Sequence, residues 1–363
     1  MKMNSPALIK RFFLVTVANL LFLAFCTPAN GTTEEEISKN FTVEPGGTLL
    51  VDVNMGSIKV SANAGNKVNI DCWRKIGRKS KSEEEAFLRE NPIEISQEGN
   101  SVTVRCRTRS KMNWSFSLWG RKHTEAKYTI TVPTKYGAAL DTAGGSVSVD
   151  GLEGEVKAHT SGGSLQLTHI HGPVSARTAG GNIKMTACEG KLNIETSGGS
   201  IRAGEGSGSL NAETAGGSIN VKKFEGRVHM HTSGGGLTIE EVAGELKGET
   251  AGGSIKAYLP AFAGPVDLKT SGGSITLDLP ADAAFNVDAH TAGGSVSSDV
   301  PIAHEGKKER GRLKGTANGG GKLVRLDTSA GSIHIGKAER LAAEASRSEN
   351  PKIEEPKPEG KPN

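Results

Sequence analysis

Polar and apolar positions repeat along the chain with a period of 18 residues. Thr, then Ala or Ser, then Gly-Gly recurs at Thr142, Thr160, Thr178, Thr196, Thr214, Thr232, Thr250, Thr270 and Thr291, with spacings of 20 and 21 at the last two steps. Counting each Thr as position 0, apolar residues return at positions 5, 7, 10, 14 and 16, and Gly occupies position 12 of the regular repeats. Apolar residues at alternate positions are typical of strands with one buried face, so we expect two short strands per repeat.

A repeat of this size cannot bury its apolar face by itself, but it can when stacked on its neighbours at about 4.8 Å per coil. The pattern therefore predicts an all-β fold, a parallel β-solenoid (β-helix), with right-handed winding expected from the crossover rule. The two glycine classes mark corners where positive φ or close backbone approach excludes a Cβ. The threonines share the parity of positions 14 and 16, so we expect them to point inward and to hydrogen-bond along their column.

The same frame extends to both ends and defines a single solenoid domain over residues 40–336. Residues 40–141 form irregular coils with insertions at 73–92 and 107–127, residues 142–300 form the regular repeats, and residues 301–336 form a last coil with a charged loop. Val68, Ile70 and Cys72 match positions 14, 16 and 0, as do Val102, Val104 and Cys106, while Ile130 and Val132 match positions 5 and 7.

Cys72 and Cys106 would then stack in adjacent coils at about 4.8 Å, inside the Cα separation that a disulfide allows. A Cys72–Cys106 disulfide and two free thiols both remain open, because directly stacked side chains do not favour the required dihedral angle.

Both insertions replace the Gly-Gly corner, and they contain all three Trp and a run of basic residues. The candidate binding residues are Trp73, Arg107, Arg109, Lys111, Trp114, Trp119, Arg121 and Lys122. Exposed Trp beside basic residues could grip an anionic glycan or a lipid headgroup. The alternative is that the insertions only cover an open sheet edge. Ser82 with Glu85 resembles a capping box and predicts a short helix within 82–90.

The chain begins with a candidate secretory signal over residues 1–29. Three basic residues are followed by an apolar run too short to span a bilayer, and small residues suit cleavage after Ala29. Lipidation at Cys26 is the alternative. Removing this segment lowers the formal charge from +4 to +1, so the charge gives no reason to expect a nucleic-acid partner. Residues 337–363 are rich in Ala, Glu, Lys and Pro and predict a disordered polar tail.

We find no pattern that predicts catalytic residues, a metal site or a cofactor. The outward positions of the regular repeats carry scattered polar residues without a carboxylate cluster. No spacing of His or Cys supplies the three or four ligands of a zinc site. The Gly-Gly pairs lack the Lys and the following helix of a nucleotide-binding loop. The 48 Gly of the 363 residues instead reflect corner geometry.

Several motifs in order resemble the bacterial putative-adhesin β-solenoid domain family. They are Phe41-Thr-Val-Glu-Pro-Gly-Gly-Thr-Leu, Gly56-Ser-Ile-Lys-Val, Tyr128-Thr-Ile-Thr-Val-Pro, the serial Thr-(Ser/Ala)-Gly-Gly, Leu277-Asp-Leu-Pro and Thr328-Ser-Ala-Gly-Ser-Ile. The resemblance covers residues 40–336 and implies a cell-envelope protein without agreed catalytic residues.

Together these features predict an exported, non-enzymatic adhesin-like or envelope-scaffold module on the cell surface, in the periplasm or outside the cell. Its partner would be an anionic glycan, a lipid headgroup or an envelope protein. The alternatives are an envelope-stress sensor that binds lipid or peptide and a carbohydrate-active β-helix enzyme.

Overall fold

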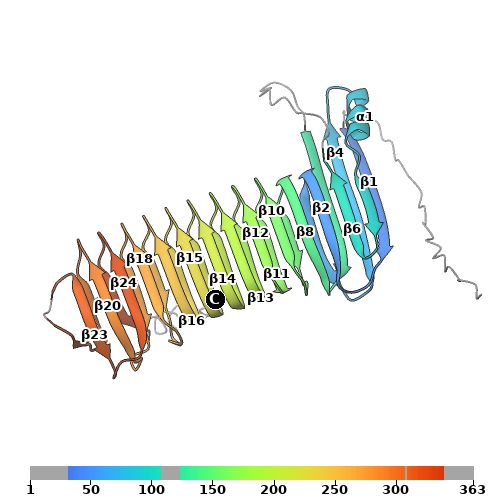
Figure 1. Cartoon of the computed structure of the whole chain (residues 1–363). Helices are drawn as coiled ribbons and strands as arrows, with labels where there is room; N and C mark the ends of the chain where they lie inside the picture. The colour runs from blue at the N-terminus through green and yellow to red at the C-terminus, as the bar shows by residue number, and fades with distance from the viewer. Residues whose placement is uncertain (1–31, 108–122, 307–308, 339–363) are drawn as a thin grey trace, which may run out of the picture.

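The protein is a long rod of stacked β-coils (Figure 1). Its computed structural model describes residues 32–107, 123–306 and 309–338. In these described residues, twenty-five strands join into one hydrogen-bonded sheet, and the strands of successive regular coils pair in parallel. The predicted parallel β-solenoid is therefore confirmed: each coil obtains its strand partners from its neighbours, as expected for a repeat that cannot fold alone.

The sheet winds around the core and presents two faces. The threonine face contains the strands that end at the repeat threonines and those stacked on them. Its spatial order is β5 (Glu94–Glu98), β6 (Ser101–Cys106), β2 (Gly47–Met55), β8 (Tyr136–Gly144), β10 (Val156–Thr160), β12 (Val174–Thr178), the second halves of β13 (Ile183–Thr196), β14 (Ile201–Thr214), β15 (Ile219–Thr232) and β16 (Leu237–Thr250), then β18 (Val266–Thr270), β24 (Lys322–Thr328), β20 (Phe285–Thr291), β23 (Arg312–Ala317) and β22 (Ala303–His304).

The serine face contains the strands that follow the Gly-Gly corner and those stacked on them. Its spatial order is β1 (Thr32–Thr42), β4 (Lys67–Gly77), β7 (His123–Pro133), β3 (Ser57–Asn63), β9 (Val147–Asp150), β11 (Leu165–His171), the first halves of β13 to β16, β17 (Ile255–Tyr258), β19 (Ile275–Leu279), β25 (Ile333–Lys337) and β21 (Val296–Ser298). Helix α1 (Lys81–Glu90) follows β4.

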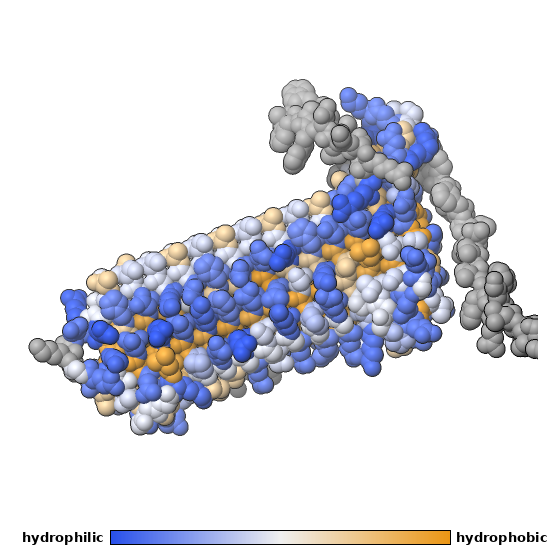
Figure 2. Space-filling model, in the orientation of Figure 1, coloured by the Kyte–Doolittle hydropathy of each residue, from blue (hydrophilic) through white to orange (hydrophobic). Residues whose placement is uncertain are grey.

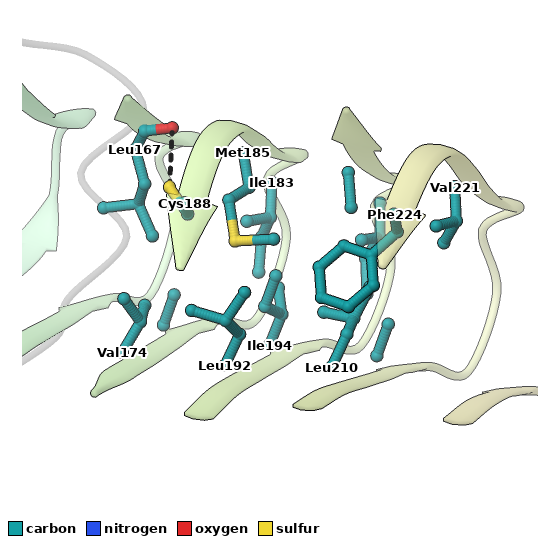
Figure 3. Close-up of a cluster of buried hydrophobic side chains, with 14 of the residues drawn as sticks. Leu167, Val174, Ile183, Met185, Cys188, Leu192, Ile194, Leu210, Val221 and Phe224 are labelled. Atoms are coloured by element: carbon teal, nitrogen blue, oxygen red, sulfur yellow. Dashed lines mark hydrogen bonds between the residues drawn. The ribbon is translucent and has the colours of Figure 1, made fainter. Parts of the chain in front are cut away.

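The core between the two faces is built from aliphatic side chains at the predicted inward positions. Leu167, Ile183 and Met185 on the serine face meet Leu192 and Ile194 on the threonine face (Figure 3). Each of these side chains is almost completely buried. Burial of this kind stabilises a fold by about 25 cal/mol for each Å² of apolar surface removed from water, so the period-18 apolar columns hold the coils together.

The repeat threonines point inward, as predicted, and they hydrogen-bond to the backbone of the Gly-Gly corner. Thr196 Oγ1 donates to the carbonyl of Gly181 in the preceding coil at 2.9 Å and accepts from Gly199 N–H at 3.2 Å. The same pair of bonds recurs in the regular coils. The expected bonding between threonine hydroxyls is wrong, because these hydroxyls satisfy buried glycine backbone groups instead.

The second corner is a bend within a continuous strand. Each strand from β13 to β16 is 14 residues long and passes through both faces, whereas the sequence predicted two separate short strands in each coil. Position 9 takes positive φ, as at Glu205 (49°), and so does the glycine at position 12, as at Gly208 (110°). Hydrogen-bond pairing with the next coil resumes directly after the bend, so a single strand continues around the corner.

The terminal coils do not stack in sequence order. The coil formed by β24 and β25 lies between the coil of β18 and β19 and the coil of β20 and β21. At the other end, the coil of β2 and β3 lies between β6–β7 and β8–β9. Antiparallel strands then cover the ends of the stack. We expected residues 301–336 to form the last coil of the stack. This expectation is wrong, because the coil of β20 and β21 lies beyond the coil of β24 and β25.

Two assignments in the N-terminal coils also need correction. Strand β4 pairs antiparallel with β7 and places Cys72 opposite Tyr128, so Val68, Ile70 and Cys72 do not continue the threonine column. Tyr128, rather than Ile130, takes position 5, because it pairs with Ile58. The alternation of apolar residues is the same in parallel and antiparallel strands, and it therefore could not reveal the direction of β4.

Candidate functional site

The first insertion, residues 73–92, lies at the N-terminal end of the rod, where β4 and α1 extend the serine face (Figure 1). Ser80 caps α1 by accepting a hydrogen bond from Glu83 N–H at 3.3 Å. The predicted helix is present, but its cap is Ser80 rather than Ser82, whose hydroxyl instead lies 3.1 Å from that of Ser80. Buried Glu84 fixes the helix by accepting from the hydroxyl of Thr33 on β1 at 2.6 Å.

Trp73 lies half-buried on the outward side of β4. Its neighbours across the sheet are Glu36 of β1 and Lys127 of β7. The Lys127 ammonium lies 4.9 Å from the centre of the indole ring, a cation–π contact. Hydrogen bonds from Lys75 and, more weakly, from the Trp73 indole lower the pKa of the Glu34 carboxyl. An aromatic ring, ammonium groups and a carboxylate are thus gathered on one exposed surface, which we call the Trp73 surface.

Arg107 lies on the opposite face from Trp73. It follows β6, and its Nε donates to Asp52 Oδ1 of β2 at 2.5 Å. That hydrogen bond, together with the carboxylate charge, raises the pKa of the guanidinium. The structure therefore separates two residues that the sequence placed in one site. Arg109, Lys111, Trp114, Trp119, Arg121 and Lys122 lie outside the described residues, and their part in binding stays a prediction.

A buried polar cluster, missed by the sequence analysis, lies beneath the Trp73 surface. Arg74 is only 2 % exposed; it forms an ion pair with Glu35 of β1 and donates to the backbone carbonyl of Asn91 at 2.6 Å. Its Nη1 also lies 3.9 Å from Cys106 Sγ. The sequence did contain a signal for this cluster. Arg74 is a basic residue at an inward-facing position of β4, between Cys72 and Ile76. Buried charges need such partners, and the cluster joins β1, β4 and β6.

Cys72 and Cys106 are not stacked in one column. Cys72 pairs with residues of β1 and β7, whereas Cys106 pairs with Val53 of β2 on the other face. The structure records both as free cysteines, which is one of the two outcomes that the sequence left open. Burial raises the pKa of Cys72 to about 12 and also raises that of Cys106. These thiols are protonated at neutral pH and poorly nucleophilic.

Many charged side chains on the regular coils face a partner of opposite charge in the next coil. Examples are Arg177–Glu195 at 3.2 Å, Arg227–Glu245 at 3.0 Å and Lys222–Glu240 at 3.0 Å. Figure 2 shows hydrophilic residues running in rows along the visible side of the rod, with a band of hydrophobic residues between them. Among the residues that the structure describes, no group of three or more His, Cys, Asp or Glu could hold a metal ion.

No helix in the described part of the chain is long and apolar enough to cross a membrane. The structure also has a shallow open depression at the second corner, floored by Gly47, Gly137, Gly154 and Gly172. The depression is open rather than enclosed, and its described lining residues do not include a group of side chains with shifted pKa values.

Comparison with known proteins gives a family and several similar solved structures, among them the following three. The sequence profile of the Toastrack DUF4097 family matches residues 52–336. No curated protein matches significantly. A putative adhesin from Bacteroides fragilis is 14% identical, with 84% of this chain and 97% of that chain covered and a TM-score of 0.32. A putative cell adhesion protein from Clostridium sporogenes is 12% identical, with 84% and 100% covered and a TM-score of 0.19. A putative lipid binding protein from Parabacteroides distasonis is 12% identical, with 85% and 97% covered and a TM-score of 0.32.

Proposed function

The chain belongs to the Toastrack DUF4097 family, and we propose that it is an exported, non-enzymatic module that binds a component of the cell envelope in the manner of an adhesin. The regular coils form a rod, and the insertions add a different surface at one end of it. Export by the segment 1–29 is part of this proposal. Sequencing the N-terminus of the secreted chain is expected to give Asn30, whereas a lipid-modified Cys26 would contradict cleavage at Ala29.

The Trp73 surface is the observation that carries the proposal. A half-exposed indole offers an apolar platform for a sugar ring, and charged groups beside it can orient a polar ligand. Lys127 is bound to Glu125 at 3.1 Å, yet 61% of its side chain remains exposed. Its ammonium can therefore turn toward the anionic group of a ligand while the ring stays in place.

The titratable groups support binding rather than catalysis. Burial raises the pKa values of Cys72, Cys106, Cys188 and Tyr128. A nucleophile or general base needs a pKa close to the working pH and access to substrate. These four side chains are buried and their pKa values are raised away from neutral pH, so they meet neither requirement. Both properties agree with a structural role for these residues.

A glycan array together with anionic vesicles would test this function, using the full secreted chain. Replacing Trp73 with Ala should weaken binding by about three- to tenfold, because stacking on an aromatic ring contributes roughly 0.5–1.5 kcal/mol. Tyr258→Ala is a matched control, since Tyr258 lies partly exposed on the serine face far from the Trp73 surface, and this variant should bind as the unaltered protein does.

Equal binding by the Trp73→Ala variant would remove this surface from the proposal. Retention on vesicles alone would favour the lipid-binding alternative. Release of reducing ends from any bound polysaccharide would show an enzyme and overturn the proposed function.

A further inference from the structure

Two outward columns of the serine face, next to the Gly-Gly corner, contain no acidic residue. We call them the donor strip. The first column, at position 4, is Ser57, Ser146, Ser164, Asn182, Ser200, Ser218, Gly236, Ser254, Ser274, Ser332 and Ser295. The second, at position 6, is Lys59, Ser148, Gln166, Lys184, Arg202, Asn220, Thr238, Lys256, Thr276 and His334.

The hydrogen bonds of the first column leave its hydroxyl protons free. Ser146 Oγ accepts from Ser164 N–H at 3.3 Å, and Ser218 Oγ accepts from Gly236 N–H at 3.2 Å. The pattern continues along the column. These bonds use an oxygen lone pair and hold the side chain in place, but the O–H group can still donate. In the described residues, no serine of this column donates its hydroxyl proton to another protein group, so the column offers a row of ordered donors.

Among the described residues, the adjacent cations of the second column lack the ion pairs that many cations elsewhere on the regular coils form. Lys184 of β13 and Arg202 of β14 are cross-strand neighbours, and both are exposed. Neither forms an ion pair with any described residue, unlike Arg177, Lys222 and Arg227. Like charges placed directly opposite each other on a sheet are destabilising. An anion bound between Lys184 and Arg202 would relieve that repulsion.

The geometry points to a linear acidic polysaccharide as the partner of the donor strip. We propose that its carboxylates bind Lys184 and Arg202 while its hydroxyl oxygens accept from the serine hydroxyls. Lys59 and Lys256 each lie three coils from this pair, at about 14 Å for a coil spacing of about 4.8 Å. The cations are therefore spread along a path that an extended polymer can follow. This surface is separate from Trp73, so it does not depend on the proposed binding there.

Other polyanions fit the strip less well. The exposed large hydrophobic residues of the described chain are Met55 and Leu323, and both lie on strands of the threonine face. The strip thus lacks apolar groups that could enter a lipid surface. Double-stranded nucleic acid carries about one charge per 1.7 Å, much denser than these cations, and the strip has no Phe, Tyr or Trp side chain on which a base could stack.

The test uses polygalacturonate as the probe, with dextran as the uncharged control polymer. The variant Lys184→Gln/Arg202→Gln should bind polygalacturonate about tenfold more weakly, because it loses two ionic contacts. Arg177→Gln/Arg227→Gln removes the same charge elsewhere on the rod and should change affinity less than about twofold.

Thermal unfolding provides a second measurement, which distinguishes a loss of binding from a loss of folding. Polygalacturonate should raise the Tm of the unaltered protein but not that of Lys184→Gln/Arg202→Gln, whose own Tm should be equal or higher because the repulsion is gone. Equal losses of affinity in the two double variants would mean that overall charge attracts polygalacturonate and that it has no specific site. Equal affinity for double-stranded DNA or for phosphatidylglycerol vesicles would show that the strip does not select a polysaccharide. Either result would overturn the inference.

Discussion

At the residue scale, the two glycines of the Gly-Gly corner have different roles. A Cβ on Gly199 would lie 1.9 Å from the carbonyl oxygen of Gly181 in the preceding coil, whereas the nearest atom to a Cβ on Gly198 would be 3.6 Å away. The clash at the second glycine involves backbone on both sides, so no side chain can move to relieve it. Only the second glycine is required by the stacking.

Paired substitutions test this difference. Gly199→Ala should lower the free energy of unfolding by several kcal/mol or prevent folding, because neighbouring coils must separate to admit a methyl group. Gly198→Ala should change it by less than about 1 kcal/mol, since its Cβ has room. Urea unfolding followed by circular dichroism measures both. Similar losses in the two variants would refute the assignment.

The buried thiols make stability depend on pH in a defined direction. The pKa of Cys72 is about 12 in the folded protein, above the 9.0 of an unperturbed thiol, so the folded state favours the protonated thiol. The stabilisation is fully present below pH about 9 and is lost as pH rises toward 12. The urea midpoint should therefore fall over this range, and it should fall less in Cys72→Ala.

Alkylation by iodoacetamide gives an independent check on the same thiols. At pH 8 a thiol with this pKa is about one ten-thousandth thiolate, so native Cys72 should react much more slowly than the unfolded chain. Rapid native labelling would contradict the burial. A mass that rises by two on reduction would show that Cys72 and Cys106 are joined after all.

At the element scale, the interleaved coils place the last two described strands, β24 and β25, inside the stack. Strand β24 pairs with both β18 and β20, although it is close to the end of the described chain, whereas β23 pairs with β20 and the two-residue β22. A strand with partners on both sides opens only when its neighbours open. The final described coil therefore locks β20 and β21 onto the rod.

Hydrogen exchange can detect this arrangement in the intact protein. Amides of Val324 and Leu326 in β24 should be protected as strongly as those of β15 in the middle of the rod. Amides of β23 should exchange faster because it lies near the end of the stack. Exchange of β24 at the rate of β23 would contradict the interleaved order.

At the scale of the whole molecule, the rod has a repetitive body and one elaborated end. The regular coils neutralise most of their charges within the rod through ladders such as Arg177–Glu195 and Arg227–Glu245, each worth little by itself. The Trp73 surface and the donor strip depart from this pattern in different ways. The repeat thus supplies a scaffold, and the exceptions to it identify the surfaces where binding is proposed.

The sequence by itself determined the coil. The 18-residue period, the inward threonines and the two glycine corners were all predictable, because each position meets the same position of the next coil and must satisfy the same packing. The tertiary structure decided the order of the terminal coils, the direction of β4 and the surroundings of Trp73, Arg74 and Arg107. Strand direction and the order of stacking do not alter the alternation of apolar residues, so these features depend on pairings between distant segments that no local pattern specifies.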